Sequence, residues 1–430
     1  MECTETTGTP LPNLALIDQG PGPPGQAARV LASLRAAAPV PMRISLSFAA
    51  QQGKDGDVPR TELAPPAITP ADLEDLRARL HGYREVVLPP GFGWERGTDG
   101  AYLHQLLRYW ADSYEWREHE ERIRAWPWAL SQQTPTPVRA IHQRASNPAA
   151  MPVLLLHGWP DSVLRFERVL PMLTDLHVVV PCLPGFPFAA PIPEGGLSSA
   201  GLAEAVADAM AEFGYGSYVV SAGDVGCDVA ESLAARYPER VAALHLTDVS
   251  QLHFLIDLPD DLSDAERAYV ERGRTWQHTE RAYMHEQSTK PHTLAVGLGD
   301  SPAGLAAWLL EKLRSWTDSG GNLESVFTRD ELLTWITAYW VTGSIGTSFT
   351  PYIESANSFR SSGRVDVPTA FTVFPRDLVN APREFAERFF NVRSWSDEPA
   401  GGHFAAWECP DAYAQGIRTA IAVSRDRAFH

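Results

Sequence analysis

The segment at residues 218–226 constrains the fold of this chain more than any other, and it reads YVVSAGDVG. Its apolar start predicts a buried strand, and small residues stand two positions before and two positions after Asp224. A sharp turn from a strand into a helix leaves no room for larger side chains at those positions. The segment therefore predicts a nucleophile elbow in which Asp224 takes the place of the usual serine.

Asp224 also has a plainer interpretation, because an isolated Gly-Asp-x-Gly is more often a turn in which the aspartate caps the following helix. That interpretation fits Asp228 better, since this residue falls inside the predicted helix and should face solvent or be paired. We expect the helix to begin at about Cys227, so that its first N–H groups point at Asp224 and can stabilise an anion. The catalytic interpretation of Asp224 therefore depends on the rest of the site.

Short apolar runs before and after the elbow predict further buried strands. They lie at 138–145, 152–156, 178–180, 242–246 and 370–374, and helical stretches are expected at about 163–173, 199–213 and 228–236. Strands that alternate with helices form a parallel sheet covered on both faces. The sequence therefore predicts an α/β fold built on a mostly parallel sheet.

Composition and helix-breaking residues divide the chain into five stretches. Residues 1–67 are rich in Pro, Gly and Ala and should be irregular, with one short helix at about 29–37. Thr69 and Pro70 suit the start of a helix, and a helical arm is expected from there. The predicted boundaries are 68–137 for the arm, 138–248 for the first part of the sheet domain, 249–360 for an inserted helical cap and 361–430 for the second part, which ends in a helix at about 410–423.

Charge and cysteine content exclude several classes of protein. The formal net charge is −17, and the 36 Lys and Arg form no basic run, so nucleic acid and anionic membranes should be repelled. Cys3, Cys182, Cys227 and Cys409 are far apart and lack the spacing of a zinc site. The first residues lack the features of a secretory signal, and no run of about 18 apolar residues occurs. We expect a cytoplasmic protein without nucleic-acid or membrane partners; the oligomeric state, including a homo-oligomer, stays open.

A carboxylate nucleophile leaves an ester, so the site needs a base to activate water and an acid to orient that base. His403 lies in the segment AGGHF at 400–404, between the last predicted strand and the last predicted helix. The order nucleophile, acid, histidine along the chain favours His403 as the base. Asp377 follows the strand at 370–374 and should lie at the carboxyl edge of the sheet, where ligands bind. Glu354 is the alternative acid if that residue follows an earlier strand.

The segment HGWP at 157–160 closes the first buried strand of the predicted parallel sheet, so its backbone can face the elbow. The backbone N–H groups of Trp159 and Val225 would form an oxyanion hole for hydrolysis of the ester. His157 is interpreted as a residue that makes a structural hydrogen bond within this turn, and we assign it no catalytic role.

These motifs together resemble the microsomal-type epoxide hydrolases, which include the juvenile-hormone epoxide hydrolases and soluble bacterial relatives. The likeness extends over about residues 68–423. The segments that carry it are YW at 109–110, YEW at 114–116, HGWP at 157–160, PGF at 184–186, the elbow, YMHEQSTKP at 283–291, DSPAGLA at 300–306 and GGHFAA at 401–406.

The resemblance implies an α/β-hydrolase fold with a helical cap and an N-terminal helical arm. It implies hydrolysis of an epoxide to a vicinal diol through an ester on Asp224, with no metal or organic cofactor and with a small-molecule epoxide and water as the binding partners. It also implies two cap tyrosines that hydrogen-bond the epoxide oxygen. Tyr283, at the head of its motif, and Tyr352, in TPY at 350–352, match them.

The chain departs from the family pattern at three points, one of which is FPF at 186–188 in place of a Tyr-Gly-Phe pattern. Val225 stands where the family usually has Trp after the nucleophile, and Asp161 stands where Gly commonly follows Trp-Pro. The smaller Val225 suggests a bulky natural-product epoxide as substrate. A haloalkane or haloacid dehalogenase, in which Trp159 would bind halide, is an alternative enzyme class. A catalytically inactive ligand-binding protein is an alternative of another kind.

Overall fold

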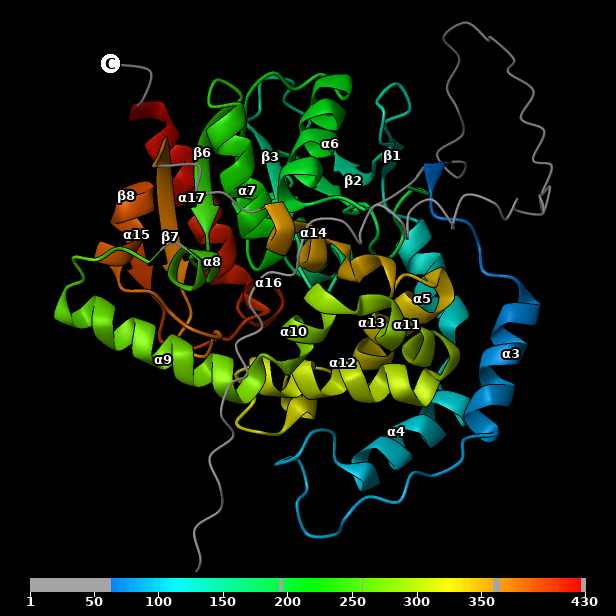
Figure 1. Ribbon diagram of the computed structural model, residues 1–430. Coiled ribbons are helices and arrows are strands. Elements are labelled where there is room, and N and C mark those ends of the chain that lie inside the picture. Colours follow the sequence, from blue (N-terminus) through cyan, green and yellow to red (C-terminus); the bar gives the residue numbers. More distant parts are fainter. Residues whose placement is uncertain (1–62, 193–195, 257, 359–363, 427–430) are drawn as a thin grey trace, which may run out of the picture. The chain divides into compact units, whose positions relative to one another are not determined.

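A mostly parallel sheet forms the centre of the fold (Figure 1). The computed structural model describes residues 63–192, 196–256, 258–358 and 364–426. Within these residues the strand order is β1-β2-β4-β3-β5-β6-β7-β8. Strand β2 runs antiparallel to β1 and to β4, and the other neighbours are parallel. The predicted α/β-hydrolase fold is confirmed, whereas the short helix predicted at about 29–37 lies outside the described residues.

Six of the strands coincide with the apolar runs that predicted them, and two do not. The predicted strands are β2 (Arg139–Gln143), β3 (Pro152–Leu156), β4 (His177–Pro181), β5 (Tyr218–Ala222), β6 (Val241–Leu246) and β7 (Val365–Val373). The sequence did not predict β1 (Trp128–Leu130) or β8 (Phe390–Asp397), which form the two edges of the sheet. Strand β8 therefore replaces β7 as the last strand before His403.

The register of the parallel strands brings their carboxyl ends together at one edge of the sheet. Ala222, the last residue of β5, pairs with Leu156 on β3 and with Leu246 on β6. Leu246 pairs in turn with Phe371 on β7. The turns that follow these strands must therefore converge, which is the arrangement that the site requires.

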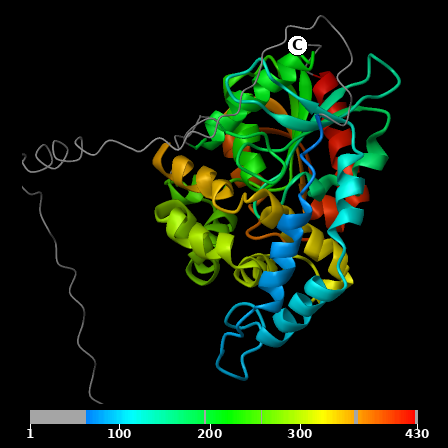
Figure 2. The ribbon, with the colours of Figure 1, turned by 90° about the vertical axis from the view of Figure 1, so that its right-hand side faces the viewer.

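Helices cover both faces of the sheet. Figure 2 shows α6 (Ser199–Glu212) and α7 (Val225–Arg236), in green, on one side of the strands and α17 (Pro410–Asp426), in red, on the other. The stretch predicted as one helix at 163–173 instead forms two short 3-10 helices, η2 (Val163–Phe166) and η3 (Leu170–Leu173). A proline at position 171 removes a backbone donor there and breaks the regular helical pattern.

A run of helices lies between β6 and β7 and gathers at one end of the strands (Figure 1). It comprises α8 (Leu252–Leu255), α9 (Asp264–Glu280), α10 (Ala282–Thr289), α11 (Pro291–Asp300), α12 (Pro302–Trp316), η4 (Leu323–Ser325), α13 (Arg329–Thr342), η5 (Thr347–Phe349) and α14 (Thr350–Ser358). We call this run the cap. Its boundaries at 249 and 360, like the other domain boundaries, stay predictions.

The N-terminal arm packs against the cap. It consists of α3 (Pro70–His81), α4 (Gly100–Asp112) and α5 (Trp116–Arg124), and the Thr69 side chain caps α3 by accepting a hydrogen bond from the N–H of Asp72. Arg79 on α3 donates to the carbonyl of Asp300 at 2.8 Å, and Tyr114 hydrogen-bonds Thr334 on α13 at 3.0 Å. Two short helices, α15 (Arg383–Phe389) and α16 (Ala405–Glu408), complete the second part of the sheet domain.

Across the described ranges no single helix is long and apolar enough to span a membrane. Helices α11 and α12 together reach that length and apolar composition, with a bend of 116° between them.

Candidate active site

The elbow at Asp224 is a strained turn that only small neighbours permit. Asp224 has φ 56° and ψ −135°, a backbone conformation that side-chain-bearing residues rarely adopt. A Cβ atom on Gly226 would lie 2.6 Å from the carbonyl oxygen of Leu156, and one on Gly223 would lie 2.7 Å from Oγ1 of Thr247. Helix α7 begins at Val225, two residues earlier than expected, so its N-terminus lies directly beside the nucleophile position.

The turn after β3 holds one oxygen of the Asp224 carboxylate. The backbone N–H of Trp159 donates a hydrogen bond to Oδ1 of Asp224 at 2.8 Å. A Cβ atom on Gly158 would lie 2.2 Å from the same oxygen, so a glycine is needed at this position. Val225 is the first residue of α7, so its backbone N–H group has no acceptor within the helix. Both predicted oxyanion-hole amides therefore belong to backbone segments that border Asp224.

His403 lies between two carboxylates. Its Nδ1 is 2.7 Å from Oδ1 of Asp377, and its Nε2 is 3.4 Å from Oδ2 of Asp224. The His403 side chain is 1% exposed, so the ring is held out of bulk water. The alternative acid, Glu354, belongs to α14, and Asp377 is the residue that hydrogen-bonds the ring. The structure thus brings together the three residues that the sequence predicted as nucleophile, base and acid.

The pKa values of this cluster follow from burial and charge. Burial alone would lower the pKa of His403, but the negative charge of Asp377 and the contact with Asp224 outweigh it and raise this pKa to about 10. Burial tends to raise the pKa of Asp377, yet the His403 cation and its hydrogen bond lower it below the usual value. The raised pKa of His403 and the lowered pKa of Asp377 favour an imidazolium paired with the Asp377 carboxylate at neutral pH.

Tyr283 on α10 and Tyr352 on α14 line a cavity of about 150 Å³ that also contacts Asp224. Their ring centroids are 6.1 Å apart, and the Tyr283 ring stacks on Trp159 at 5.3 Å. Burial, reinforced by nearby negative charge, raises the pKa of both hydroxyls well above 10, so both stay protonated donors at neutral pH. The cavity therefore has a carboxylate on one wall and hydroxyl donors on another.

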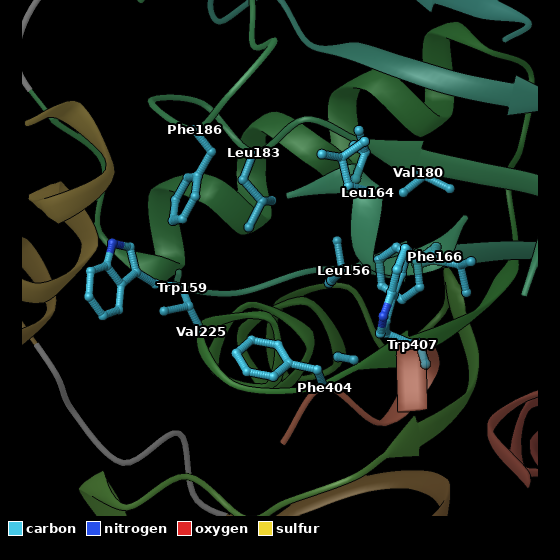
Figure 3. Packing of buried hydrophobic residues seen from close by; sticks show 14 of the residues in the cluster. Leu156, Trp159, Leu164, Phe166, Val180, Leu183, Phe186, Val225, Phe404 and Trp407 are labelled. Atoms are coloured by element: carbon cyan, nitrogen blue, oxygen red, sulfur yellow. The ribbon is translucent and has the colours of Figure 1, made fainter. Parts of the chain in front are cut away.

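His157 has a structural role, as the sequence suggested. Its Nε2 accepts a hydrogen bond from the N–H of Leu183 at 3.2 Å, and its Nδ1 lies 3.1 Å from the carbonyl oxygen of Gly158. An accepting Nε2 assigns the ring proton to Nδ1, which then donates to that carbonyl. Figure 3 shows the neighbouring Trp159 and Val225 among the buried side chains that pack between the turn and the elbow.

Asp161, which departs from the family pattern, forms a buried ion pair. Its Oδ2 accepts from Nη1 of Arg165 at 2.6 Å, and its Oδ1 accepts from the N–H of Gly158 at 2.9 Å. Arg165 also donates to the carbonyl of His403 at 2.5 Å. The hydrogen bond from Arg165 to His403 joins residues 238 positions apart, so no local sequence pattern indicates it.

Two further carboxyls, Asp228 and Asp248, line the cavity. Asp228 lies one helical turn beyond Asp224, and burial raises its pKa to about 8, although a hydrogen bond with Ser250 opposes the shift. Asp228 was expected to face solvent or be paired; it faces the cavity and pairs with Ser250. Oδ2 of Asp248 accepts from the N–H of Asp224 at 3.3 Å. The position of Asp248 directly after β6 matches that of Asp377 after β7, and this signal could have identified it from the sequence.

Comparison with known families agrees with this geometry. Residues 64–166 match the family described as epoxide hydrolase N terminus, and residues 151–293 match the alpha/beta hydrolase fold. The two matches together cover the arm, the β3 turn, the elbow and the start of the cap.

Individual proteins are similar over most of the chain. Epoxide hydrolase 1 of Sus scrofa is 31% identical over 394 residues, which cover 81% of this chain and 85% of that protein. Juvenile hormone epoxide hydrolase 1 of Ctenocephalides felis is 30% identical over 385 residues, which cover 81% and 83%. The crystal structure of juvenile hormone epoxide hydrolase from Bombyx mori has a TM-score of 0.75 and 28% identity, and covers 85% of this chain and 94% of that one.

Proposed function

Because the chain belongs to the epoxide hydrolase family, and is thus an enzyme that acts on a small-molecule epoxide and water, we propose that it forms the vicinal diol in two steps through an ester on Asp224. The observation that carries this proposal is the cavity that Asp224 shares with Tyr283 and Tyr352. A nucleophile and two hydroxyl donors around one small space can act on the carbon and the oxygen of the same strained ring.

In the first step, Oδ2 of Asp224 attacks an epoxide carbon and the carbon–oxygen bond of the ring breaks. The departing oxygen takes a proton from Tyr283 or Tyr352, while the other hydroxyl donates a hydrogen bond to it. The products of this step are a hydroxyalkyl ester on Asp224 and one tyrosinate. Oδ1 becomes the ester carbonyl oxygen and remains beside the N–H of Trp159.

The second step requires His403 to lose its proton. Ester formation removes the negative charge of Asp224, which is one of the two charges that raise the pKa of His403. The tyrosinate formed in the first step can accept the proton, so that both groups return to their neutral forms. His403 then takes a proton from water, and the resulting hydroxide attacks the ester carbon.

Collapse of the tetrahedral intermediate releases the diol. The negative oxygen of this intermediate is stabilised by the N–H groups of Trp159 and Val225, and Asp377 stabilises the His403 cation. The departing alkoxide takes the proton from His403, and the carboxylic acid left on Asp224 then passes its proton to His403, which restores the starting forms of both groups. The sum of both steps is epoxide plus water giving diol, and no metal or organic cofactor is required.

We propose a compact epoxide as the substrate in this state of the enzyme. A cavity of about 150 Å³ is close in volume to an engineered cavity that binds benzene. The bulky natural-product epoxide suggested by Val225 stays a prediction, and it would require the cavity to widen. A panel that contains styrene oxide and larger epoxides separates the two: higher kcat/KM for the larger compounds would contradict the compact substrate.

We also propose that the enzyme acts in a reducing compartment such as the cytoplasm. Cys182 and Cys227 are buried as free thiols, and Cys409 is free as well. Fractionation of the producing cells tests this location. Native mass spectrometry would determine the oligomeric state.

The ester itself is tested with a His403→Gln variant incubated with styrene oxide and, separately, with a haloalkane. Without the base the ester should accumulate, and intact-protein mass spectrometry should show a mass increase equal to the whole epoxide, mapped to Asp224. His285→Gln, an exposed cap histidine, is the matched control and should show no stable adduct. An alkyl adduct formed only from the haloalkane would favour a dehalogenase, and no adduct from either, with no turnover by the wild type, would favour a non-catalytic protein.

A further inference from the structure

The loop that carries His403 has all of its backbone donors occupied. We call residues 401–404 the base loop. Its four N–H groups donate in turn to Oδ2 of Asp318 (2.9 Å, from Gly401), to Oε2 of Glu408 (3.0 Å, from Gly402), to the carbonyl of Trp316 (2.8 Å, from His403) and to Oε1 of Glu408 (2.9 Å, from Phe404). Two of the acceptors, on Trp316 and Asp318, belong to the cap. The other two are the two oxygens of the Glu408 carboxylate.

Glu408 joins these two sets of acceptors. Besides two donors from the base loop, it accepts a hydrogen bond from the N–H of Asp318 at 2.8 Å. Trp316 is the last residue of α12 in the cap, and Asp318 follows two positions later. Burial raises the pKa of Glu408 to about 6, so that it is a carboxylate above this pH. A carboxylate that accepts several N–H groups fixes all of them in one geometry.

Gly402 shows how closely these groups approach one another. A Cβ atom on Gly402 would lie 2.5 Å from the carbonyl oxygen of Trp316, 2.8 Å from the N of Asp318 and 3.0 Å from Oε1 of Glu408. The second glycine of the GGHF motif is therefore required by this cap contact. The contact is thus built into the loop that carries the base.

The side chain of Trp316 extends the connection to the oxygen donors. Its ring lies 5.1 Å from the His403 ring at 72° and 5.2 Å from the Tyr283 ring at 60°. One cap residue thereby contacts the base of the second step and a proton donor of the first. Displacement of the base loop from the cap would move the His403 ring relative to the Asp224 ester.

We propose that Glu408 and Asp318 are positioning residues that hold the base loop to the cap and thereby set the rate of ester hydrolysis. This inference rests on the two-step route through Asp224. Attack by Asp224 on the epoxide does not use His403 as a base, so loss of either acceptor should affect the second step far more than the first. Misplacement of a catalytic group by about 1 Å lowers a rate by about 100-fold. Loss of one of the acceptors should misplace His403 only in part, and we expect it to lower the rate of ester hydrolysis by at least about tenfold.

The test measures both steps separately in the full chain at pH 8, where Glu408 is ionised. Rapid quench followed by intact-protein mass spectrometry gives the rates at which the styrene oxide adduct on Asp224 appears and disappears. The variants are Glu408→Gln, which places an NH₂ group against backbone donors, and Asp318→Ala, which removes the acceptor for Gly401. Asp411→Asn, an exposed acid three residues after Glu408, is the control.

We expect Glu408→Gln and Asp318→Ala to form the adduct at a rate within about twofold of the wild type and to hydrolyse it at least about tenfold more slowly. Circular dichroism establishes which variants fold. If Glu408→Gln does not fold, the test uses Asp318→Ala, because Asp318 is partly exposed. Hydrolysis at the wild-type rate in a folded variant, or equal slowing of both steps, would overturn this inference but would leave the two-step route unaffected. An absence of any adduct in His403→Gln would overturn the two-step route and this inference with it.

Discussion

The backbone N–H of Trp159 holds Oδ1 of Asp224 at 2.8 Å in the resting enzyme. Only Oδ2, which lies 3.4 Å from Nε2 of His403, is therefore available to attack a substrate. The two oxygens of one carboxylate thus have different fates: Oδ2 becomes part of the ester bond, and Oδ1 becomes its carbonyl oxygen.

This difference predicts where the oxygen of water goes. In a single turnover with excess enzyme in H₂¹⁸O, water attacks the ester carbon, so ¹⁸O should enter Asp224 and the first diol should carry the unlabelled Oδ2. Mass spectrometry of the diol and of the peptide containing Asp224 measures both. A labelled diol in the first turnover would instead mean that water attacks the epoxide directly.

Tyr283 and Tyr352 should act in the first step. Tyr283→Phe and Tyr352→Phe should each slow ester formation by about tenfold or more, and the double variant by about 10² to 10⁴, because a hydroxyl donor to the leaving oxygen is lost. Ester hydrolysis should change much less. Tyr269→Phe is the control, since this buried cap hydroxyl has no hydrogen-bond partner within the described part of the chain. Equal effects of all three changes would contradict the assignment.

Asp377 should act in the second step. Asp377→Asn removes the charge that stabilises the His403 cation, and we expect ester hydrolysis to fall by about 10² to 10⁴ while the ester still forms. Burst kinetics with styrene oxide measure both rates. Glu354→Gln, at the alternative position, should behave like the wild type; if Glu354→Gln is the impaired variant, the acid has been assigned wrongly.

The cavity carboxyl of Asp228 should make stability depend on pH. Burial raises its pKa on folding from the ordinary value of 3.8 to about 8, so the folded state keeps a proton that the unfolded state has lost, and stability falls as pH rises between these values. Asp228→Asn removes this cost. The free energy of unfolding of this variant minus that of the wild type should be larger at pH 8 than at pH 5 by at least about 1 kcal/mol.

Urea unfolding at the two pH values measures this gain. The exposed Asp366→Asn is the control and should show no such change. A constant difference between Asp228→Asn and the wild type at both pH values would show that Asp228 ionises normally.

The elements predicted correctly from the sequence are those with a local signal. The central strands are continuous apolar runs, and the elbow needs small residues at fixed positions around Asp224. The edge strands lack such a signal: β1 has three residues, and β8 reads FNVRSWSD and is largely half-buried or exposed. Family resemblance alone selected Tyr283 and Tyr352 among the tyrosines.

The supporting residues that the sequence did not indicate act over long separations along the chain. Glu408 accepts from Asp318 across 90 positions, and Arg165 donates to His403 across 238. No periodicity or spacing connects such partners, because tertiary packing decides which of many polar side chains meet. The same limit applies to Asp228, whose helical position alone does not show that it faces a cavity.

The packing of the arm on the cap restricts how this enzyme can be recombined with its relatives. Arg79 and Tyr114 of the arm bind the cap at Asp300 and Thr334, more than 200 positions away, and Glu408 binds it from the other end of the chain. A chimera that exchanges only the segment between β6 and β7 would therefore separate three sets of partners at once. Crossover points that exchange arm, cap and C-terminal segment together should yield folded hybrids far more often than an exchange of the cap alone.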